Sequence, residues 1–308
     1  MHLLIPFAFC CSDGCAAALP SLRLPHLEKL LSRLTPMPLD AGDEFSLSPP
    51  HERALAIALG LPVADGLIPW AAHQSQCPGA WGFVTPCHWR AGAKHIAMSG
   101  AGLPDFSESE SQHLLAAMQP YFEEDGITLR YESPARWLAH GDAFDALATA
   151  SLDRVVGRDV KAWLSRASSA TRLQRLQTEM QMLLYNHPVN DARLARGAPP
   201  VNAFWVSGTG ALPVNWTRAA NEAAPVVVST LRQAALQEDW AAWAQAWQTL
   251  DATECAALLH ALHQARPVQL TLCGERNAQS FGVHRTGYLK RLMNIVGHKP
   301  PSTLLEKL

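Results

Sequence analysis

Apolar residues recur every three or four positions in several stretches of the chain. This spacing, clearest over 24–34 (before Pro36) and 171–185, puts them on one helix face. Residues 107–122 also show it, behind Ser107 and Glu110 at capping-box spacing. Three more helices are predicted: one with Ser48 as N-cap and Gly60 at its end, one carrying Trp240, Trp243 and Trp247, and one capped by Asp251 and Glu254 that runs to about His263.

Between the predicted helices lie short runs that predict β-strands. Residues 127–132 alternate apolar and polar positions, and Asp125-Gly126 before them is typical of a turn. The other runs are mostly apolar, which is typical of strands covered on both faces. They comprise residues 1–10, 80–89, 94–98, 136–140, 203–206, 225–228 and 268–272, with a turn near Gly92.

The order of these elements predicts the fold class. Mostly apolar strands separated by helices favour an α/β protein with a layered mixed sheet and helices on both faces. The length of 308 residues fits about one to two domains. We expect a single α/β unit over 1–308, with a more helical subdomain over about 107–196. The tail from Pro301 is expected to be peripheral.

The tryptophans at 240, 243 and 247 allow two interpretations, because they lie on one side of a single predicted helix. They could form a platform for a ligand, or they could pack in the core. Large aromatic side chains at helical spacing ordinarily bury against a sheet, so core packing is favoured.

Composition and charge exclude some classes of partner. The chain is 48% hydrophobic and 17% charged, as in ordinary folded domains, and its formal net charge is −2. This balance offers no basic field for nucleic acid or for an anionic membrane. No stretch approaches the ~20 apolar residues of a membrane-spanning helix, and residues 1–10 have no basic start of the kind that signal peptides have. We expect no nucleic-acid and no membrane partner.

The seven cysteines indicate a reducing compartment. Their number is odd, and no CxxC pair occurs, so we expect reduced thiols and a cytoplasmic protein. A metal site at residues 10, 11 and 15 is conceivable, but buried or half-buried thiols are the favoured interpretation. The cysteines are Cys10, Cys11, Cys15, Cys77, Cys87, Cys255 and Cys273.

A polar cluster follows the helix predicted over 171–185. Arg193 could clamp a carboxylate or phosphate through its planar guanidinium, and His187 could donate a hydrogen bond or move a proton. A turn at 207–210 could present backbone N–H groups to an anion, because its glycines permit close approach. Taken alone, these residues favour a helix cap and a strand end over a ligand site. The candidate ligand-binding residues here are His187, Asn190, Arg193, Asn202, Ser207, Gly208, Thr209 and Gly210.

Arg53 and His88 are added as candidates that assist this anion site. His88 could instead join His51 and His95 in a metal site. Neighbouring strand residues point to opposite faces, however, so Cys87 and His88 cannot share a metal within one strand. Hydrogen-bonded histidines are favoured, and we expect no metal and no cofactor.

The polar cluster also resembles a known family. The run His187-Pro-Val-Asn190 with Arg193, Gly197, Pro200-Val-Asn202, Trp205, Gly208 and Gly210 resembles a segment of archaeal-type, cofactor-independent phosphoglycerate mutases. Most of the chain is similar to a bacterial group labelled RpfE-type regulatory proteins, whose members are also described as phosphoglycerate mutases. The likeness to that group includes residues 1–9, Ser48-Pro-Pro-His51-Glu52-Arg53, Thr85-Pro-Cys-His88-Trp89 with His95, and Leu272-Cys-Gly-Glu-Arg276.

The chain departs from the mutase pattern at the residues that carry out the reaction in that family. That family carries an N-terminal Asp-Gly-x-Gly-Asp, a Ser or Thr nucleophile and late Asp/His clusters that bind two metals. Here residues 3–8 read Leu-Leu-Ile-Pro-Phe-Ala, and no Asp-x-x-Gly-His run follows Gly210. Two-metal phosphoryl transfer needs several such ligands at once. The resemblance therefore implies an anion-binding segment and leaves mutase activity open.

Three functions remain. The favoured one is a binding protein for a small phosphate- or carboxylate-bearing metabolite, similar to phosphoglycerate, or a degenerate mutase-like protein with a regulatory role. The second is an active mutase- or phosphatase-like enzyme with rearranged metal ligands. The third is a regulatory protein that acts through protein partners, as the RpfE-type resemblance implies.

Overall fold

The computed structural model describes residues 1–92, 95–100, 103–165, 167–217, 224–283 and 301–308. The chain forms two compact units, one made of 1–60 with 218–308 and the other of 61–217. This division differs from the expected single unit with a helical part over about 107–196. Those helices belong to the second unit, where they pack with a sheet of their own. The expected α/β class, with helices on both sheet faces, is confirmed.

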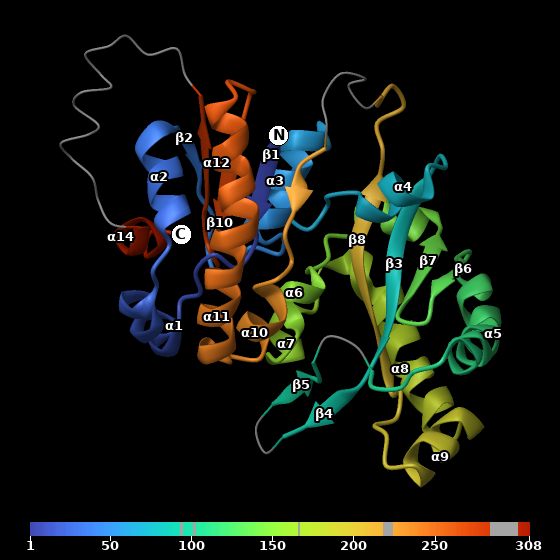
Figure 1. The fold of residues 1–308 in the computed structure, drawn as a ribbon. Coiled ribbons are helices and arrows are strands. Elements are labelled where there is room, and N and C mark those ends of the chain that lie inside the picture. Colours follow the sequence, from blue (N-terminus) through green and yellow to red (C-terminus); the bar gives the residue numbers. More distant parts are fainter. Residues whose placement is uncertain (93–94, 101–102, 166, 218–223, 284–300) are drawn as a thin grey trace. The chain divides into compact units, whose positions relative to one another are not determined.

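The first unit contains a five-stranded mixed sheet in the order β2-β11-β10-β1-β9. Strands β1, β2 and β10 of this sheet are labelled in Figure 1. Strand β1 runs parallel to β10 and β9, whereas β11 is antiparallel to both β10 and β2. The strands span His2–Ile5 (β1), Thr35–Asp40 (β2), Val226–Val227 (β9), Gln269–Cys273 (β10) and Ala278–Gly282 (β11). Its helices span Asp13–Ala18 (α1), Pro25–Arg33 (α2), Pro50–Leu59 (α3), Arg232–Leu236 (α10), Trp240–Leu250 (α11), Ala256–His263 (α12) and Pro301–Leu305 (α14).

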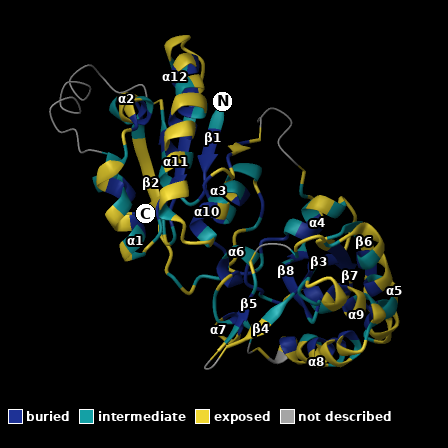
Figure 2. Cartoon of the chain, turned by 60° about the horizontal axis from the view of Figure 1, so that its bottom comes forward, coloured by how far each residue is buried: buried dark blue, intermediate teal, exposed yellow. Residues whose placement is uncertain are grey.

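Both faces of this sheet carry helices. Leu3, Ile5 and the fully buried Trp243 and Trp247 share one core cluster with residues of α2 and α12, so the tryptophans pack in the core as favoured. On the other face Leu4 packs with Ala54 and Leu55 of α3. Figure 2 shows how α11 and α12 bury one side and expose the other.

Two predictions for the C-terminal part of this unit were wrong. Asp251 and Glu254 do not cap a new helix, because α11 continues through a π-helical turn, Asp251–Cys255, directly into α12. Asp251 instead turns inward and accepts hydrogen bonds from the backbone N–H groups of His26 and Leu27 at the start of α2. The tail is also not peripheral: Leu305 and Leu308 are buried, and the Leu308 carbonyl accepts from the backbone of Asn277.

The second unit contains a four-stranded antiparallel sheet in the order β6-β7-β3-β8 and a separate β4-β5 hairpin. Its strands span Ala80–Cys87 (β3), Trp89–Ala91 (β4), Ile96–Met98 (β5), Thr128–Ser133 (β6), Arg136–His140 (β7) and Ala203–Ala211 (β8). Its helices span Trp70–Ser75 (α4), Glu108–Glu124 (α5), Leu152–Val155 (α6), Val160–Trp163 (α7), Thr171–Tyr185 (α8) and Pro188–Ala195 (α9). The strand expected over 80–89 thus ends at Cys87, and Lys94 lies outside the described residues.

Helices α5 and α8 cover one face of this sheet through Met118, Phe122, Leu176 and Met180, and α4 lies against the other. The capping box predicted from Ser107 and Glu110 is present at the start of α5. Helix α8 has the predicted bounds because its apolar stripe faces the sheet. These packed elements bring the start of α5 and helix α9 together.

Among the described residues, none of the helices has the length and apolar character required to cross a membrane.

Candidate functional site

Arg193, in the last turn of α9, has no exposed surface. Its Nε donates to the Pro199 carbonyl at 2.8 Å, and its Nη2 to the Pro104 carbonyl at 3.0 Å. Its Nη1 lies 3.3 Å from a Glu110 carboxylate oxygen and 3.4 Å from the Asp105 carbonyl. Burial lowers the pKa of Arg193, and the nearby Glu110 charge only partly offsets this effect. The guanidinium expected to clamp an anion is thus bound to the protein itself.

Glu110 joins this arginine to a second one. Its Oε2 accepts from the backbone N–H and the hydroxyl of Ser107 at 2.9 and 3.1 Å, and its Oε1 accepts from Arg196 at 2.7 Å. Partial burial raises the pKa of Glu110, but the hydrogen bonds from Ser107 and Arg196 and the charge of Arg193 outweigh it and hold that pKa below its ordinary value. Glu110 therefore stays ionised at neutral pH and fixes both guanidinium groups.

Arg196 and His187 lie at the wall of an open hollow of about 730 Å³ between the start of α5 and the length of α9. Arg196 is the exposed arginine of the cluster, with 42% of its side chain accessible. His187 is the N-cap of α9 and accepts from the Val189 backbone N–H through Nδ1, so the neutral ring carries its proton on Nε2. The hollow is lined by Asp105, Ser107, Glu110, His113, His187, Pro188, Val189, Ala192 and Arg196.

His113 of α5 faces the same hollow. Its Nδ1 lies 2.7 Å from the Ser109 carbonyl, to which it donates, so Nε2 is the ring's remaining acceptor. Burial, and after it the neighbouring His113, lower the pKa of His187, although Asp191 acts in the opposite direction. The hollow therefore combines one imidazole that offers a donor, one that offers an acceptor, and one accessible guanidinium.

The two predicted asparagines and His88 brace the backbone around this segment. Asn190 is buried, donates to the carbonyls of Leu184 and Val201, and accepts from the Val201 N–H, each at 2.7 Å. Asn202 bonds to both the N–H and the carbonyl of Trp89. His88 Nδ1 lies 2.8 Å from the Pro200 carbonyl. Each side chain thus has backbone partners.

Residues 207–210 lie inside β8 rather than in a turn. The register with β3 shifts there, and Gly208 adopts φ of 62°, as in a β-bulge. A Cβ at Gly208 would lie 2.9 Å from the Phe83 ring and 3.0 Å from Trp70, so side chains occupy the space expected for a ligand. Thr209 is fully buried, and its hydroxyl contacts Thr149 at 2.9 Å and the Leu147 carbonyl at 2.5 Å. This segment of β8 forms the irregularity in the sheet, and its glycines permit close packing of neighbouring side chains. It comprises Ser207, Gly208, Thr209 and Gly210.

Arg53 belongs to the first unit. It is 8% exposed and donates to Asp40 at 3.1 Å, to the Ser48 carbonyl at 2.9 Å and to the Arg276 carbonyl at 3.1 Å. Its helix, α3, has Pro49 rather than the predicted Ser48 as N-cap. Arg53 ties the start of α3 to β2 and to the turn after β10.

Sequence reasoning missed two residues of the hollow and used two others only as a helix cap. Arg196 lies three positions after Arg193, so the same helical segment supplies one buried and one accessible guanidinium. His113 carried no signal of its own in the sequence. Ser107 and Glu110 were predicted as a capping box, which they are, but that motif does not reveal the arginines beside it.

No group of three or more His, Cys, Asp or Glu side chains in the described part of the chain is arranged to hold a metal ion.

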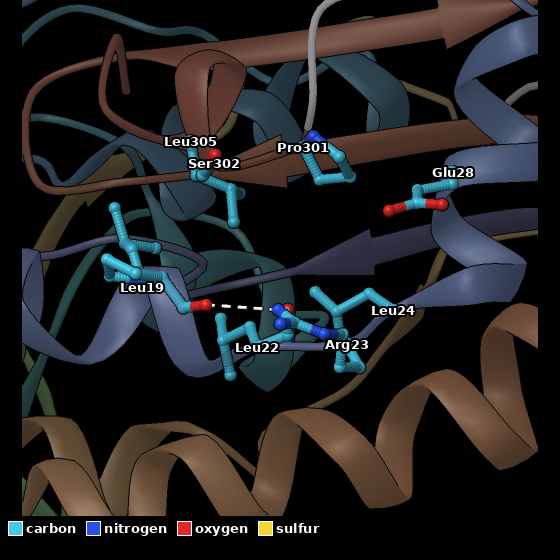
Figure 3. Close-up of a pocket in the computed structure, with 9 residues that line it drawn as sticks. Leu19, Leu22, Arg23, Leu24, Glu28, Pro301, Ser302 and Leu305 are labelled. Carbon is cyan, nitrogen blue, oxygen red and sulfur yellow. Dashed lines mark hydrogen bonds between the residues drawn. The ribbon is translucent and has the colours of Figure 1, made fainter.

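Two further cavities lie within the first unit. One, of about 650 Å³, lies on the sheet face that α3 leaves partly uncovered, where His2, Thr271 and Ser280 are joined by hydrogen bonds of 2.8 Å. The other, of about 250 Å³, lies between α2 and α14 and is drawn in Figure 3. Arg23 in this cavity donates hydrogen bonds to the neighbouring backbone carbonyls of Pro20 and Leu22.

Fold and site together define an α/β protein of two units with a polar hollow in the second unit. No protein-family model matches the chain, and no curated protein matches it either. The chain is similar to the solved structure of a cofactor-independent phosphoglycerate mutase from Thermoplasma acidophilum DSM 1728, at 12% identity over 93% of this chain and 90% of that one, with a TM-score of 0.38. It is also similar to the PH0037 protein from Pyrococcus horikoshii, at 11% identity over 92% and 87%, with a TM-score of 0.35. Likenesses this distant carry no argument about the site, and they do not show membership of the RpfE-type group.

Proposed function

We propose that the second unit binds a small anionic metabolite, one that bears a phosphate or a carboxylate, in the hollow between α5 and α9. The observation that carries this proposal is that Arg196, His187 and His113 line one hollow. Guanidinium and imidazole N–H groups are the ordinary protein donors to such oxyanions. The role first assigned to Arg193 passes to Arg196, while Arg193 holds the wall in place.

The charges around the hollow should make the proposed anion affinity depend on pH. The positive charges of Arg193 and Arg196 are matched by Glu110 and Asp105. A proton taken up by His187 therefore adds net positive charge to the hollow. Because burial lowers the pKa of His187, the added attraction from that residue develops below pH 6.5. Anion affinity is expected to rise as the pH falls through this range.

The proposal covers binding alone. The Ser107 hydroxyl, which lies at the hollow, is engaged in the capping box: it donates to Glu110 Oε2 and accepts from the Glu110 N–H. This engagement favours a role in binding or ligand-dependent regulation over covalent chemistry at Ser107.

Titration calorimetry with 3-phosphoglycerate, inorganic phosphate and acetate tests the proposal, with glycerol as the uncharged control. Arg196→Ala is expected to weaken phosphate-bearing ligands by about tenfold to a hundredfold, the effect of one lost charge-assisted hydrogen bond. Arg196→Lys should recover part of the loss, because an ammonium keeps the charge without the planar fork. The matched control is Arg175→Ala on α8, which removes another exposed arginine paired with a carboxylate, Asp125.

Two results would contradict this function. One is the absence of binding by any of the anions at pH 5.5 and 7.5. The other is equal affinity in the wild type and in Arg196→Ala, because binding would then occur elsewhere.

A further inference from the structure

Cys10 and Cys15 of the first unit lie in direct contact. The chain leaves β1 and passes Cys10 before α1 begins, and Ser12 caps α1 by accepting from the Cys15 N–H at 3.2 Å. This cap turns the helix so that Cys15 Sγ lies 3.4 Å from the Cys10 backbone nitrogen, whose N–H it accepts. This contact places the Cys10 and Cys15 side chains next to each other. Cys15 is fully buried, whereas Cys10 is half-buried, so Cys10 is the accessible member.

The contact makes the two thiols chemically unequal. The hydrogen bond from the Cys10 thiol, aided by the Cys10 backbone N–H, lowers the pKa of Cys15, although burial and Glu275 oppose this effect. The same bond, together with burial, raises the pKa of Cys10. The pair therefore loses its first proton as one unit, and the charge then resides mainly on the sulfur of Cys15. A thiolate is the form of cysteine that reacts with oxidants.

Other cysteines lack this arrangement. Burial raises the pKa of Cys87, Cys255 and Cys273, each of which is a buried thiol. Burial, and after it the charge of Glu275, also raise the pKa of Cys11, whose backbone N–H donates to a Glu275 carboxylate oxygen at 2.8 Å. Glu275 thus fixes the backbone at Cys11 and makes the exposed thiol beside the pair the less reactive one.

From this geometry we infer that Cys10 and Cys15 are a site of reversible oxidation, which hydrogen peroxide converts to an intramolecular disulfide. The Cys10 thiol, which is the accessible one, passes its proton to the Cys15 thiolate while its sulfur attacks one peroxide oxygen; the O–O bond breaks, and a Cys10 sulfenic acid and hydroxide form. The Cys15 thiol gives its proton to this hydroxide, and its sulfur then displaces a second hydroxide from the sulfenic sulfur. That second hydroxide takes up the proton released when the pair ionised. Two thiols and one peroxide thus give one disulfide and two waters, and an external dithiol reverses the change.

The neighbouring thiol favours the disulfide over further oxidation. A sulfenic acid that forms on Cys10 already has the Cys15 sulfur beside it, so ring closure competes with attack by a second peroxide. The segment between the two cysteines is short, so the bridge removes little chain entropy from the unfolded state. The oxidation is therefore expected to change reactivity at this site more than global stability.

The experiment treats the full-length protein with graded hydrogen peroxide, alkylates the remaining thiols and maps the disulfides by mass spectrometry. The wild type is expected to lose two of its seven alkylatable thiols first, through a Cys10–Cys15 bridge that dithiothreitol removes. Cys10→Ser removes the sulfur that attacks peroxide, so this variant is expected to keep its six remaining thiols at the doses that oxidise the pair in the wild type. The matched control, Cys255→Ser, removes a different buried thiol and should still form the bridge.

Specific outcomes would overturn the inference. One is a first-formed bridge that includes Cys11 or Cys77, and another is oxidation of the pair no faster than that of Cys87 or Cys273. Because Cys15→Ser alters a core position, Cys10→Ser is the primary variant, and its circular dichroism spectrum establishes that it folds. If folded Cys10→Ser loses thiols in pairs as the wild type does, Cys10 takes no part.

Discussion

Arg53 of the first unit and Arg193 of the second are both buried, and both donate mainly to backbone carbonyl oxygens. They differ in the carboxylate that, together with those carbonyls, accepts hydrogen bonds from each guanidinium. Asp40 beside Arg53 keeps 29% of its side chain exposed, whereas Glu110 beside Arg193 keeps 13% and also holds Arg196. The guanidinium of Arg193 is therefore the more completely removed from water. A buried arginine of either kind acts as a cross-link between chain segments, and its loss should cost more where water cannot replace it.

Arg193→Ala should have the largest effect on stability. The substitution leaves the Pro104 and Pro199 carbonyls and one Glu110 carboxylate oxygen without their Arg193 donor inside the protein. Breaking a buried ion pair in this way costs about 3–5 kcal/mol of unfolding free energy. Urea unfolding of the variant and the wild type measures this loss. Arg193→Lys should recover only part of it. A loss below about 1 kcal/mol would show that water reaches these acceptors.

Arg53→Ala should destabilise the first unit by a smaller amount. Its three acceptors include the half-exposed Asp40, which water can solvate, so we expect a cost of about 2 kcal/mol. The same unfolding experiment, in parallel with Arg193→Ala, compares the two directly. If Arg53→Ala cost as much as Arg193→Ala, the exposure of the carboxylate would not be what separates the two regions.

A histidine of the first unit extends the comparison to pH, and we expect it to have the smallest effect on the free energy of unfolding. Burial, and after it the charge of the Met1 ammonium, lower the pKa of His2 from 6.5 to about 4. As the pH falls from 6.5 to 4, the unfolded chain takes up this proton before the folded one, so stability is lost in this window and is unaffected above it. Each pKa unit corresponds to about 1.4 kcal/mol, and partial exposure reduces the total to about 1–2 kcal/mol.

Unfolding at several pH values checks this prediction against His2→Gln, which keeps a polar partner for Thr271 and does not titrate. The variant should lose less stability than the wild type between pH 6.5 and 4. Burial also lowers the pKa of His187, so the second unit should show a change of the same sign. Equal pH profiles for the wild type and His2→Gln would be inconsistent with a buried neutral imidazole.

Sequence periodicity and caps predicted most of the secondary structure because those signals are local. Helix α8 has the predicted bounds, and the Ser107–Glu110 capping box is present. The errors arise where a residue far away in the sequence determines the local structure. Asp251 has the sequence of a helix cap, but it caps α2, which lies 224 positions earlier at Leu27. Leu308 is buried because the turn at Arg276 and Asn277 binds its carbonyl, which no pattern in the tail reveals.

Local patterns revealed less of the candidate site than of the fold. They drew attention to the segment that contains α9 and identified Arg193 as a strong hydrogen-bonding group. They could not tell whether its acceptors belong to a ligand or to the protein, because Pro104 and Glu110 lie more than eighty positions away. The Gly-Thr-Gly run was mistaken for a turn for a related reason. Glycines in a strand permit a bulge and close side-chain packing as readily as they permit a turn.

The strand order of the first unit has a consequence for synthesis on the ribosome. The apolar strand β1 emerges well before its partners β9 and β10, which begin only at Val226 and Gln269. At about 5–20 residues per second, this delay lasts roughly 10–50 s. The second unit is contiguous and complete at Thr217, so it can fold while the first sixty residues still wait for their partners. For that interval Leu3, Leu4 and Ile5 are an unpaired β-strand of the nascent chain, the kind of segment that chaperones bind.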